Sequence, residues 1–453
     1  MKQSALNLNS FRKGKGHVHF VGCGGAGTQP LMKLFHEKGF EVSGSDLLDN
    51  EAVRELKALG LPVAQGHRTE NLPPADLPLL LIHSSAAGKE NPELLEAQKR
   101  NALILRRGEA LGLLADLFRK TVTVSGSHGK TSVSSMLAFA LSELGAAPGC
   151  LIGGTVRNWP HNGEAGNGEF FVAEVDESDG THACIRSHLG IVTNVEDDHA
   201  WTLGGVEVLM ENFRNYAAQS ERLLYVGSPT ADRLFSTHPC ATRIPPEDSC
   251  GESVSLTTTT MDLLFPQSVL RSWGRFQKQN ALTALTALEM LGFPRPKAAE
   301  VLSRFPGVER RMTLRFDGKA FQVIEDYAHH PTELAASMEA LRSTHPGQRL
   351  VMIFQPHRYA RLERYFNDFA RILQQADRVF ITPVFAAWTA KGKFSSEDLA
   401  KATGENASAL RGSWEDMARK VRAELHPGDL VAVIGAGDLK EILPFLCREE
   451  DLA

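Results

Sequence analysis

The sequence predicts an α/β protein built from three tandem domains. Three stretches of the chain each begin with a β-type run, continue through a glycine turn or a polar loop, and then follow a helical period, which is typical of parallel α/β units. The length of 453 residues accommodates such an array at roughly 100–200 residues per domain. The three stretches place the domains at residues 1–117, 118–306 and 307–453.

Composition and charge exclude several classes of protein. The 42% hydrophobic and 23% charged content is close to the globular average, which argues against a disordered or membrane-embedded chain. A formal charge of -5 provides no global positive field for nucleic acid. The cysteines form no C-x-x-C pair, and the chain shows neither a run of ~18 apolar residues nor the apolar core of a signal peptide. We therefore expect a cytoplasmic protein with reduced thiols, no nucleic-acid partner and no membrane insertion.

The first domain contains a glycine turn that is typical of nucleotide binding. A short strand over residues 17–21 runs into GCGGAG at 22–27, and a helical pattern follows. Glycines in this G-x-G-x-x-G pattern let the backbone approach a diphosphate, while Asp46, about 20 residues further on, can hold a ribose hydroxyl. A second predicted apolar strand, in LLLIHSSA, ends in Ser84 and Ser85, whose hydroxyls we expect at the same edge of the sheet. The residues expected at this site are Gly24, Gly25, Ala26, Gly27, Asp46, Ser84 and Ser85.

Other interpretations of this turn remain open from its residues alone. The glycines would also fit a tight turn without a ligand, and the serines an ordinary turn at a strand end. If the turn does bind a nucleotide, the motif by itself favours NAD and hence a dehydrogenase.

The strongest local signal is a phosphate loop in the second domain. The β-branched run at 121–124 leads into GSHGKTS, and a long helical segment follows. Such a loop wraps phosphates in backbone N–H groups, its lysine meets the β/γ charge and its hydroxyl binds Mg²⁺. The general spacing would put the first glycine at Val124, so this is a shortened variant. A helix start with a solvated lysine is the alternative, but all the features together favour ATP binding. The loop residues are Gly126, Ser127, His128, Gly129, Lys130, Thr131 and Ser132.

Carboxylates and a histidine near this loop indicate a metal site. Glu174 lies in the otherwise apolar run FFVAEV, where a carboxylate is costly unless it is paired or bound to a cation such as Mg²⁺. A second apolar run, IVTNVEDDHA, ends in an amide, three carboxylates and His199. His199 alone could be an ordinary surface histidine. Beside a phosphate loop, we expect Thr131, Glu174 and His199 to be the metal ligands.

The third domain carries basic residues at a hinge and at two strand ends. Arg310 and Arg311 follow the Pro-Gly hinge, where a guanidinium can reach the γ-phosphate as a domain closes. The runs VIEDYAHHPTE and LVMIFQPHRY leave strands through polar loops, where ligands bind in α/β sheets. The alternative for the double histidine is helix capping by the histidines or Thr332, and for the arginines a solvated basic face.

Seven motifs in order make the chain resemble the Mur ligase family over nearly its whole length. They are VGCGGAG, GSHGKTS, EVDESDG, TNVEDDH, GVERR, DYAHHPTE and FQPHRY. The resemblance implies a Rossmann-like N-terminal domain that binds UDP, a central P-loop ATPase-type α/β domain and a Rossmann-like C-terminal domain. It is strongest with members that join L-alanine to the lactyl carboxylate of UDP-N-acetylmuramate through an acyl phosphate, in peptidoglycan synthesis. Members that recycle a murein tripeptide onto the same nucleotide sugar are the alternative.

The resemblance also implies roles for individual residues. Lys130, Glu174, His199 and Arg311 would act in catalysis, with Mg²⁺ as cofactor. Asn280 would meet adenine, and Arg311 and Asp326 would lie on the ATP side of the cleft. Ser178, His330, His357 and Arg358 would contact the sugar nucleotide or the acceptor. The partners are then the small molecules UDP-N-acetylmuramate, ATP and L-alanine, and we expect a monomer or a weak homodimer.

Some positions depart from the family pattern. Gln279 and Thr283 replace two residues of the usual His-Asn-x-x-Asn, and Trp201 stands where an aspartate is common. The stretch at 383–394 lacks the usual Ala-Gly-Glu of alanine ligases. The choice of acceptor among L-alanine, serine, glycine and tripeptide therefore stays open at the level of sequence. A non-catalytic nucleotide sensor would have lost Lys130, Glu174 or His199, and all three are present.

Overall fold

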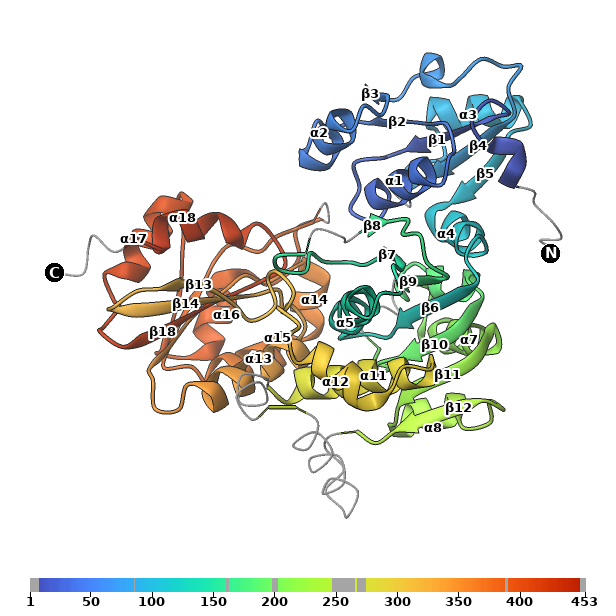
Figure 1. Ribbon diagram of the computed structural model, residues 1–453. Helices are drawn as coiled ribbons and strands as arrows, with labels where there is room; N and C mark the ends of the chain where they lie inside the picture. The colour runs from blue at the N-terminus through green and yellow to red at the C-terminus, as the bar shows by residue number, and fades with distance from the viewer. Residues whose placement is uncertain are drawn as a thin grey trace. The chain divides into compact units, whose positions relative to one another are not determined.

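The computed structural model describes residues 8–84, 86–159, 163–197, 203–246, 265–266, 274–387 and 390–448. The chain divides into two compact units, one of Met1–Thr260 with Asn280–Pro306, the other of Met261–Gln279 with Gly307–Ala453. Among the described residues, strands form three sheets, two in the first unit and one in the second (Figure 1). None of the described helices has the length and apolar character needed to cross a membrane.

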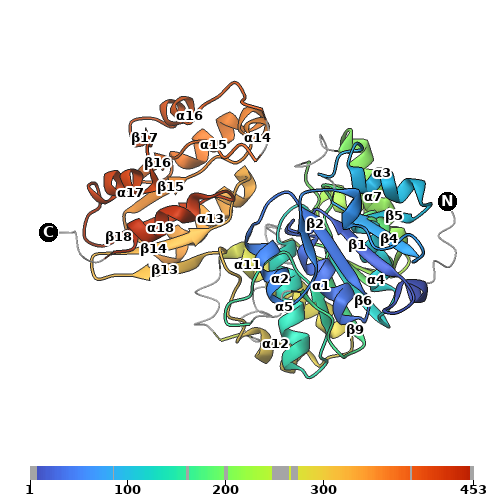
Figure 2. The ribbon, with the colours of Figure 1, turned by 90° about the horizontal axis from the view of Figure 1, so that it is seen from above.

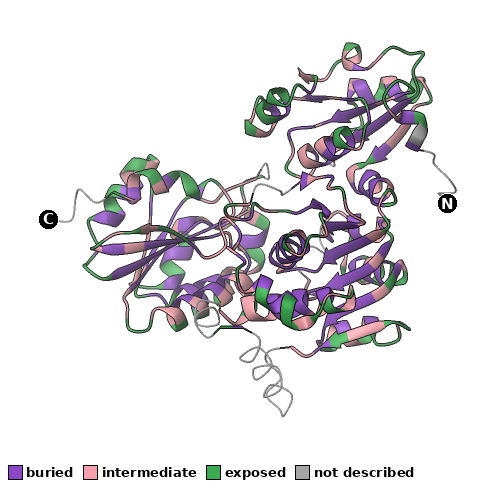
Figure 3. Cartoon of the chain, viewed as in Figure 1, coloured by how far each residue is buried: buried purple, intermediate pink, exposed green. Residues whose placement is uncertain are grey.

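The first sheet has five parallel strands in the order β3-β2-β1-β4-β5. All of β1 after its first residue is buried, as expected for a strand covered on both faces (Figure 3). The strands are β1 (His17–Val21), β2 (Val42–Asp46), β3 (Val63–Gln65), β4 (Leu79–His83) and β5 (Leu103–Arg106). The helices are α1 (Gln29–Glu37), α2 (Glu51–Ala58), α3 (Pro92–Lys99) and α4 (Arg107–Ala115), with short 3-10 turns η1 (Leu8–Phe11) and η2 (Thr69–Asn71).

The second sheet has seven strands in the order β12-β11-β10-β6-β9-β7-β8, of which only the β7–β8 pair is antiparallel. Helix α5 is buried on all sides from Ser132 to Leu141, which explains its weak amphipathic pattern. The strands are β6 (Lys120–Ser125), β7 (Gly149–Leu151), β8 (Gly163–Glu164), β9 (Phe170–Glu174), β10 (Ser187–Val192), β11 (Ser220–Val226) and β12 (Ala241–Ile244). The helices are α5 (Lys130–Glu143), η3 (Thr181–Cys184), α7 (Val206–Ala218), α8 (Pro229–Phe235), α11 (Arg275–Met290) and α12 (Arg295–Leu302).

The second unit contains a six-stranded sheet in the order β13-β14-β18-β15-β16-β17, with β13 antiparallel. Alternate residues of its central strands enter two separate apolar clusters, one on each face, because side chains alternate along a strand. Figure 2 shows the strands of this unit and the helices around them. The strands are β13 (Thr313–Asp317), β14 (Phe321–Asp326), β15 (Leu350–Phe354), β16 (Arg378–Ile381), β17 (Ala407–Ala409) and β18 (Asp429–Ile434). The helices are α13 (Pro331–Thr344), α14 (Tyr359–Arg364), α15 (Phe366–Leu373), α16 (Ser396–Thr403), α17 (Trp414–Arg422), η4 (Leu439–Ile442) and α18 (Leu443–Leu446).

The strand orders place the predicted glycine loops at topological switch points. In the first sheet β1 lies between β2 and β4, and in the second β6 lies between β10 and β9. Loops that leave neighbouring parallel strands in opposite directions create a ligand crevice at such points. The predicted α/β class with three tandem domains is confirmed, whereas the boundaries at residues 117 and 306 stay predictions.

Candidate active site

The phosphate loop links β6 to α5 and depends on two glycines. Gly126 has φ +130° and Gly129 has φ +83°, a region that side chains other than glycine rarely adopt. A Cβ on Gly126 would collide with Thr193 Oγ1, and one on Gly129 would lie 2.7 Å from Asn280 Oδ1. Both the backbone conformation and the space around the loop therefore require glycine. Asn280, which is predicted to contact adenine, lies next to Gly129 of the phosphate loop.

Lys130 is held inside the loop by a buried carboxylate. Its Nζ donates to Glu177 Oε2 at 2.7 Å, to the Gly126 carbonyl at 2.6 Å and to the Ser127 carbonyl at 3.3 Å. The side chain of Glu177 is only 1% exposed. Burial disfavours the charged ammonium, but the surrounding carboxylates, led by Glu177, outweigh it and raise the pKa of Lys130. The lysine therefore stays cationic. The sequence patterns did not single out Glu177 as its partner.

Glu174 and Thr131 meet at the carboxyl end of β9. Thr131 Oγ1 donates to Glu174 Oε1 at 3.0 Å, while Glu174 Oε2 accepts from the Gly153 amide at 2.8 Å and from Ser134 Oγ at 3.4 Å. A hydroxyl beside a carboxylate is a set of hard oxygen donors, the type that Mg²⁺ prefers. The predicted ligands Thr131 and Glu174 thus lie in contact, and their oxygen atoms are of the type that binds Mg²⁺. The third, His199, lies outside the described residues, as do Trp201 and Ser85.

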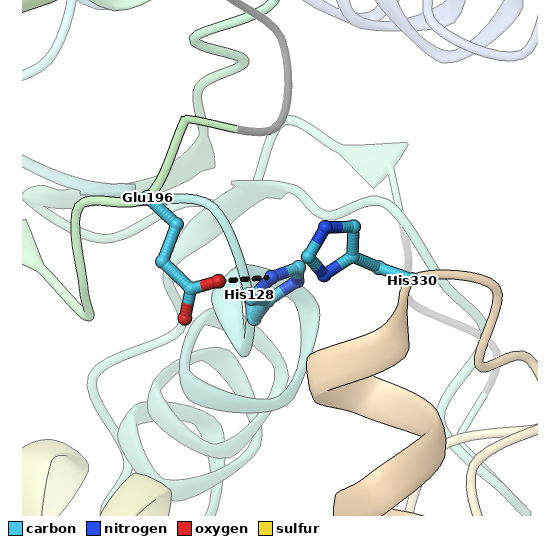
Figure 4. A group of neighbouring side chains, drawn as sticks. All are labelled: His128, Glu196 and His330. Atoms are coloured by element: carbon cyan, nitrogen blue, oxygen red, sulfur yellow. Dashed lines mark ion pairs between the residues drawn. The ribbon is translucent and has the colours of Figure 1, made fainter. Parts of the chain in front are cut away.

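The segment after β10 clamps the phosphate loop. Asn194 makes two hydrogen bonds to the peptide of His128: its Nδ2 donates to the carbonyl at 2.9 Å and its Oδ1 accepts from the amide at 2.9 Å. Thr193 Oγ1 donates to the same carbonyl at 2.6 Å. The side chains of His128 and Glu196 form an ion pair at 3.4 Å (Figure 4). Side chains from a strand remote in sequence thus fix the shape of the loop.

The first glycine turn is organised by Asp46 and Ser84. The Gly24 amide donates to Asp46 Oδ2 at 2.8 Å, and the Leu48 amide donates to Asp46 Oδ1 at 3.0 Å. A Cβ on Gly22 would lie 2.6 Å from Ser84 Oγ. The hydroxyl of Ser84 is therefore at the turn, as predicted, and the carboxylate of Asp46 supports the backbone. Whether Asp46 also binds a ribose hydroxyl stays a prediction.

The loop after β9 contains Ser178, another residue predicted to contact the sugar nucleotide or the acceptor. The amide of Ser178 donates to Asp176 Oδ1 at 2.9 Å, which folds this loop back on itself. Burial would raise the pKa of Asp176, but the charge of Lys130 and the bonds from Ser178 outweigh it and lower this pKa. Asp176 and Glu177 therefore surround Lys130 with negative charge.

In the second unit, two arginines at the hinge have different surroundings. Arg310 has φ +59° and donates to Glu325 Oε1 at 2.8 Å and to the carbonyl of Gly435 at 2.9 Å, so it holds strands together. Arg311 Nη1 instead lies 3.7 Å from Glu333 Oε1, while the guanidinium groups of both arginines lie over the ring of Tyr327. Arg310 is thus a structural residue, and Arg311 faces the loop of the predicted site.

Asp326 is a buried carboxyl at the end of β14. Its Oδ2 accepts from Ser337 Oγ at 2.6 Å and its Oδ1 from the Tyr327 amide at 2.6 Å. Burial raises the pKa of Asp326, an effect that Arg311 and Ser337 only partly offset. The structure therefore brings Asp326 and Arg311, both predicted to lie on the ATP side, into one electrostatic group.

The predicted histidines lie at the carboxyl ends of β14 and β15. His330 Nδ1 accepts from the Thr332 amide at 3.3 Å and caps α13, the helix-capping role considered from the sequence.

His357 stacks on Phe385 with 5.5 Å between ring centroids, and its Nδ1 lies 3.2 Å from Arg361 Nη1. The rings of His329 and His357 are 5.5 Å apart, so the two loops are neighbours. Arg358 has φ +66° at the start of α14.

Comparison with known proteins identifies the family. Two family models match the chain: "Mur ligase family, catalytic domain" over residues 17–119 and "Mur ligase, glutamate ligase domain" over residues 310–437. A UDP-N-acetylmuramate--L-alanine ligase from Desulfotalea psychrophila is 32% identical over 458 residues, with 95% of this chain and 98% of that protein covered. The chain belongs to the Mur ligase family. The family resemblance predicted from the seven motifs is confirmed.

Solved structures of other Mur ligases share the fold. The UDP-N-acetylmuramate-alanine ligase MurC from Thermotoga maritima has a TM-score of 0.75 at 24% identity, with 95% of this chain and 98% of that chain covered. A murein peptide ligase from Psychrobacter arcticus has a TM-score of 0.65 at 18% identity, with the same coverage of both chains. At these identities the comparison establishes the architecture and leaves the acceptor to other evidence.

Proposed function

We propose that this Mur ligase joins L-alanine to the lactyl carboxylate of UDP-N-acetylmuramate at the expense of ATP, in peptidoglycan synthesis. The observation that carries the proposal is the 32% identity to an L-alanine ligase across nearly the whole of both chains. The phosphate loop supports it, because its lysine, hydroxyl and carboxylate are arranged for a nucleoside triphosphate.

The chemistry requires activation of a carboxylate. A carboxylate is a poor electrophile, so the γ-phosphoryl group of ATP is transferred to a lactyl oxygen, giving an acyl phosphate and ADP. The amine of L-alanine then attacks the carbonyl carbon, the C–O bond to phosphate breaks, and the amine loses a proton as the amide forms. Inorganic phosphate is the leaving group. Catalysis of such a transfer is mainly positioning and charge stabilisation.

Lys130 is the residue best placed to offset charge on the transferring phosphoryl group. Its raised pKa keeps it cationic, and Glu177 holds it at the loop. Phosphate oxygens would compete with Glu177 for the ammonium. We assign Arg311 and Asp326 to the ATP side of the site and Asn280 to the nucleotide, as the family resemblance implies.

Thr131 and Glu174 would hold Mg²⁺ in the ATP site, with His199 as a further ligand. When bound, the cation neutralises negative charge on the phosphates. Gly126, Gly129 and the loop between them would bind the phosphates through backbone amides, which the clamp from Thr193 and Asn194 holds in place. Ser132 is buried at the first turn of α5.

The sugar nucleotide would bind at the first glycine turn, with its uridine diphosphate on Gly24 to Gly27, Asp46, Ser84 and Ser85. Ser178, His330, His357 and Arg358 would contact the sugar and the acceptor.

We place the enzyme in the cytoplasm, where these small molecules are made and used. A monomeric or weakly dimeric state stays a prediction.

The test is phosphate release by the purified full chain with a panel of acceptors. With Mg²⁺, ATP and UDP-N-acetylmuramate present, we expect phosphate release only when an amino-acid acceptor is added, and faster release with L-alanine than with L-serine or glycine. Equal or faster turnover with the murein tripeptide would contradict the alanine assignment. Reduction of NAD without ATP would contradict the ligase assignment altogether.

A further inference from the structure

Arg107 lies directly against the first glycine turn. It is the first residue of α4, and a Cβ placed on Gly27 would overlap its Nη1 atom. No partner of Arg107 Nη1 occurs among the hydrogen bonds of the described residues. The side chain of Arg107 is 26% exposed. A cation is thus present at the turn, although the motif itself contains only small uncharged residues.

The turn also offers backbone donors beside this cation. Gly25, Thr28 and Gln29 use their amides within the turn and the start of α1, and Gly24 donates to Asp46. The amides of Ala26 and Gly27 make no hydrogen bond to any described residue. Two unused N–H groups next to a guanidinium form an arrangement that suits a phosphate group.

A carboxylate orients the guanidinium. Arg107 Nη2 donates to Asp179 Oδ2 at 2.6 Å, and Asp179 Oδ1 accepts from the Thr181 amide at 2.9 Å. Gly108 packs against Thr181, where a Cβ would lie 2.5 Å from Thr181 Oγ1. One end of the planar fork is therefore held by the loop after β9, while the other end faces Gly27. A guanidinium can hold a carboxylate and a phosphate in this way because it has several donors in fixed directions.

We propose that Arg107 binds the diphosphate of the sugar nucleotide, together with the amides of Ala26 and Gly27. The inference rests on the proposed function, because it assigns a residue to the site where the sugar nucleotide binds. It adds to that function a specific cation for the diphosphate, which the net charge of -5 does not supply.

The experiment is calorimetric titration of the full chain, without ATP, using UDP and uridine as separate probes. In Arg107→Ala we expect UDP to bind about 10- to 100-fold more weakly, because a charged hydrogen-bonding group is lost. Uridine, which has no phosphate, should change less than about twofold. Arg107→Lys keeps the charge but not the fork, and should give an intermediate loss.

Arg106→Ala is the matched control. Arg106 is the preceding residue, its side chain is 62% exposed, and it pairs weakly with Glu109 at 3.7 Å. UDP binding should be unchanged in this variant. If Arg107→Ala does not fold, as judged by circular dichroism, the comparison of Arg107→Lys with Arg106→Lys decides in its place.

The outcomes separate the two proposals. If the unaltered chain binds UDP and Arg107→Ala binds it equally well, the role of Arg107 is wrong and the proposed function stands. If uridine and UDP are weakened alike, Arg107 is a structural link to Asp179 and the inference is also wrong. If the unaltered chain binds no UDP, both the proposed function and the inference are wrong.

Discussion

The two glycine turns of the first unit have the same backbone arrangement and differ in the partners of their positively charged side chains. Both connect a parallel strand at a switch point to a helix, and both use glycines for close approach. In the phosphate loop, Lys130 is 14% exposed and pairs with a carboxylate that is 1% exposed. In the first turn, Arg107 lies beside Gly27, and the amides of Ala26 and Gly27 have no hydrogen-bond partner among the described residues. The chemistry of each turn is therefore set by side chains from other elements.

The two regions also contrast in how they accommodate a buried carboxylate. Glu177 is compensated by a cation, whereas Glu93, which is fully buried beneath β1 and β2, is compensated by hydrogen-bond donors. Ser45 Oγ and Asn71 Nδ2 each donate to it at 2.6 Å, and His67 lies 3.2 Å away. Glu177 is thus coupled to the residue that would bind ATP, while Glu93 supports β2, the strand that ends in Asp46.

The largest expected effect is on Lys130. Lys130→Ala should reduce phosphate release by at least about 1000-fold, because the main cation at the transferring phosphoryl group is lost. It should also lower the melting temperature, because Glu177 is left buried without its cation. Adding Glu177→Gln should recover stability but not activity, as measured by phosphate release and thermal melts. Activity within tenfold of the unaltered chain would contradict the role of Lys130.

The second prediction separates strain from collision in the phosphate loop. Gly129→Ala should raise the KM for ATP by about 10- to 100-fold, since its Cβ would press on Asn280 and its φ is +83°. Gly145→Ala is the matched control, because Gly145 has φ +79° and nothing within 4 Å of its Cβ position. Steady-state kinetics and melting curves of both variants measure the difference. Equal effects would show that backbone strain alone matters.

The third prediction uses the pH dependence of stability. Burial would raise the pKa of Glu93, but the nearby imidazole of His19 and the hydrogen bonds from Ser45 and Asn71 outweigh it and hold the pKa at about 2. Because the pKa is depressed on folding, the stabilisation is complete above the unfolded value of 4.5 and is lost as pH falls towards 2. A pKa lowered from 4.5 to about 2 contributes about 3 kcal/mol of stability.

The measurement is the free energy of unfolding in denaturant between pH 2 and 5, compared with Glu93→Gln. The change in unfolding free energy over this pH range should be smaller in the variant by about 3 kcal/mol. Identical pH profiles would mean that Glu93 does not carry the linkage. Activity at neutral pH is the control, because Glu93 lies outside the catalytic machinery.

The smallest expected effect concerns the clamp on the phosphate loop. Asn194→Ala removes both hydrogen bonds to the backbone of His128 and should lower kcat/KM for ATP about tenfold, since each bond contributes about 0.5–1.5 kcal/mol. UDP binding at the first turn should be unchanged. A parallel loss of UDP binding would show that the variant disturbs the whole unit rather than the loop.

The sequence allowed much of the site to be predicted for a physical reason. Strand, glycine turn and helix are local patterns, and the loop GSHGKTS carries its own chemistry in seven consecutive residues. Glu174 was predictable because a carboxylate in an apolar run needs a partner, and the structure supplies Thr131 and Gly153. Glu177 as the partner of Lys130, and Arg107 as a neighbour of the first turn, could not be predicted, since both lie far along the chain from the loops that they contact.

By itself, the sequence determined the α/β class, the two glycine turns and the family, because each depends on residues that are close together or on ordered motifs. Only the tertiary structure decided that Glu177 pairs with Lys130, that Asn194 forms hydrogen bonds to the backbone of His128, and that Arg107 contacts Gly27. These pairs are separated by 47, 66 and 80 positions, the last counted from 27 to 107. Contacts of this kind follow from strand order and packing, which local periodicity does not encode.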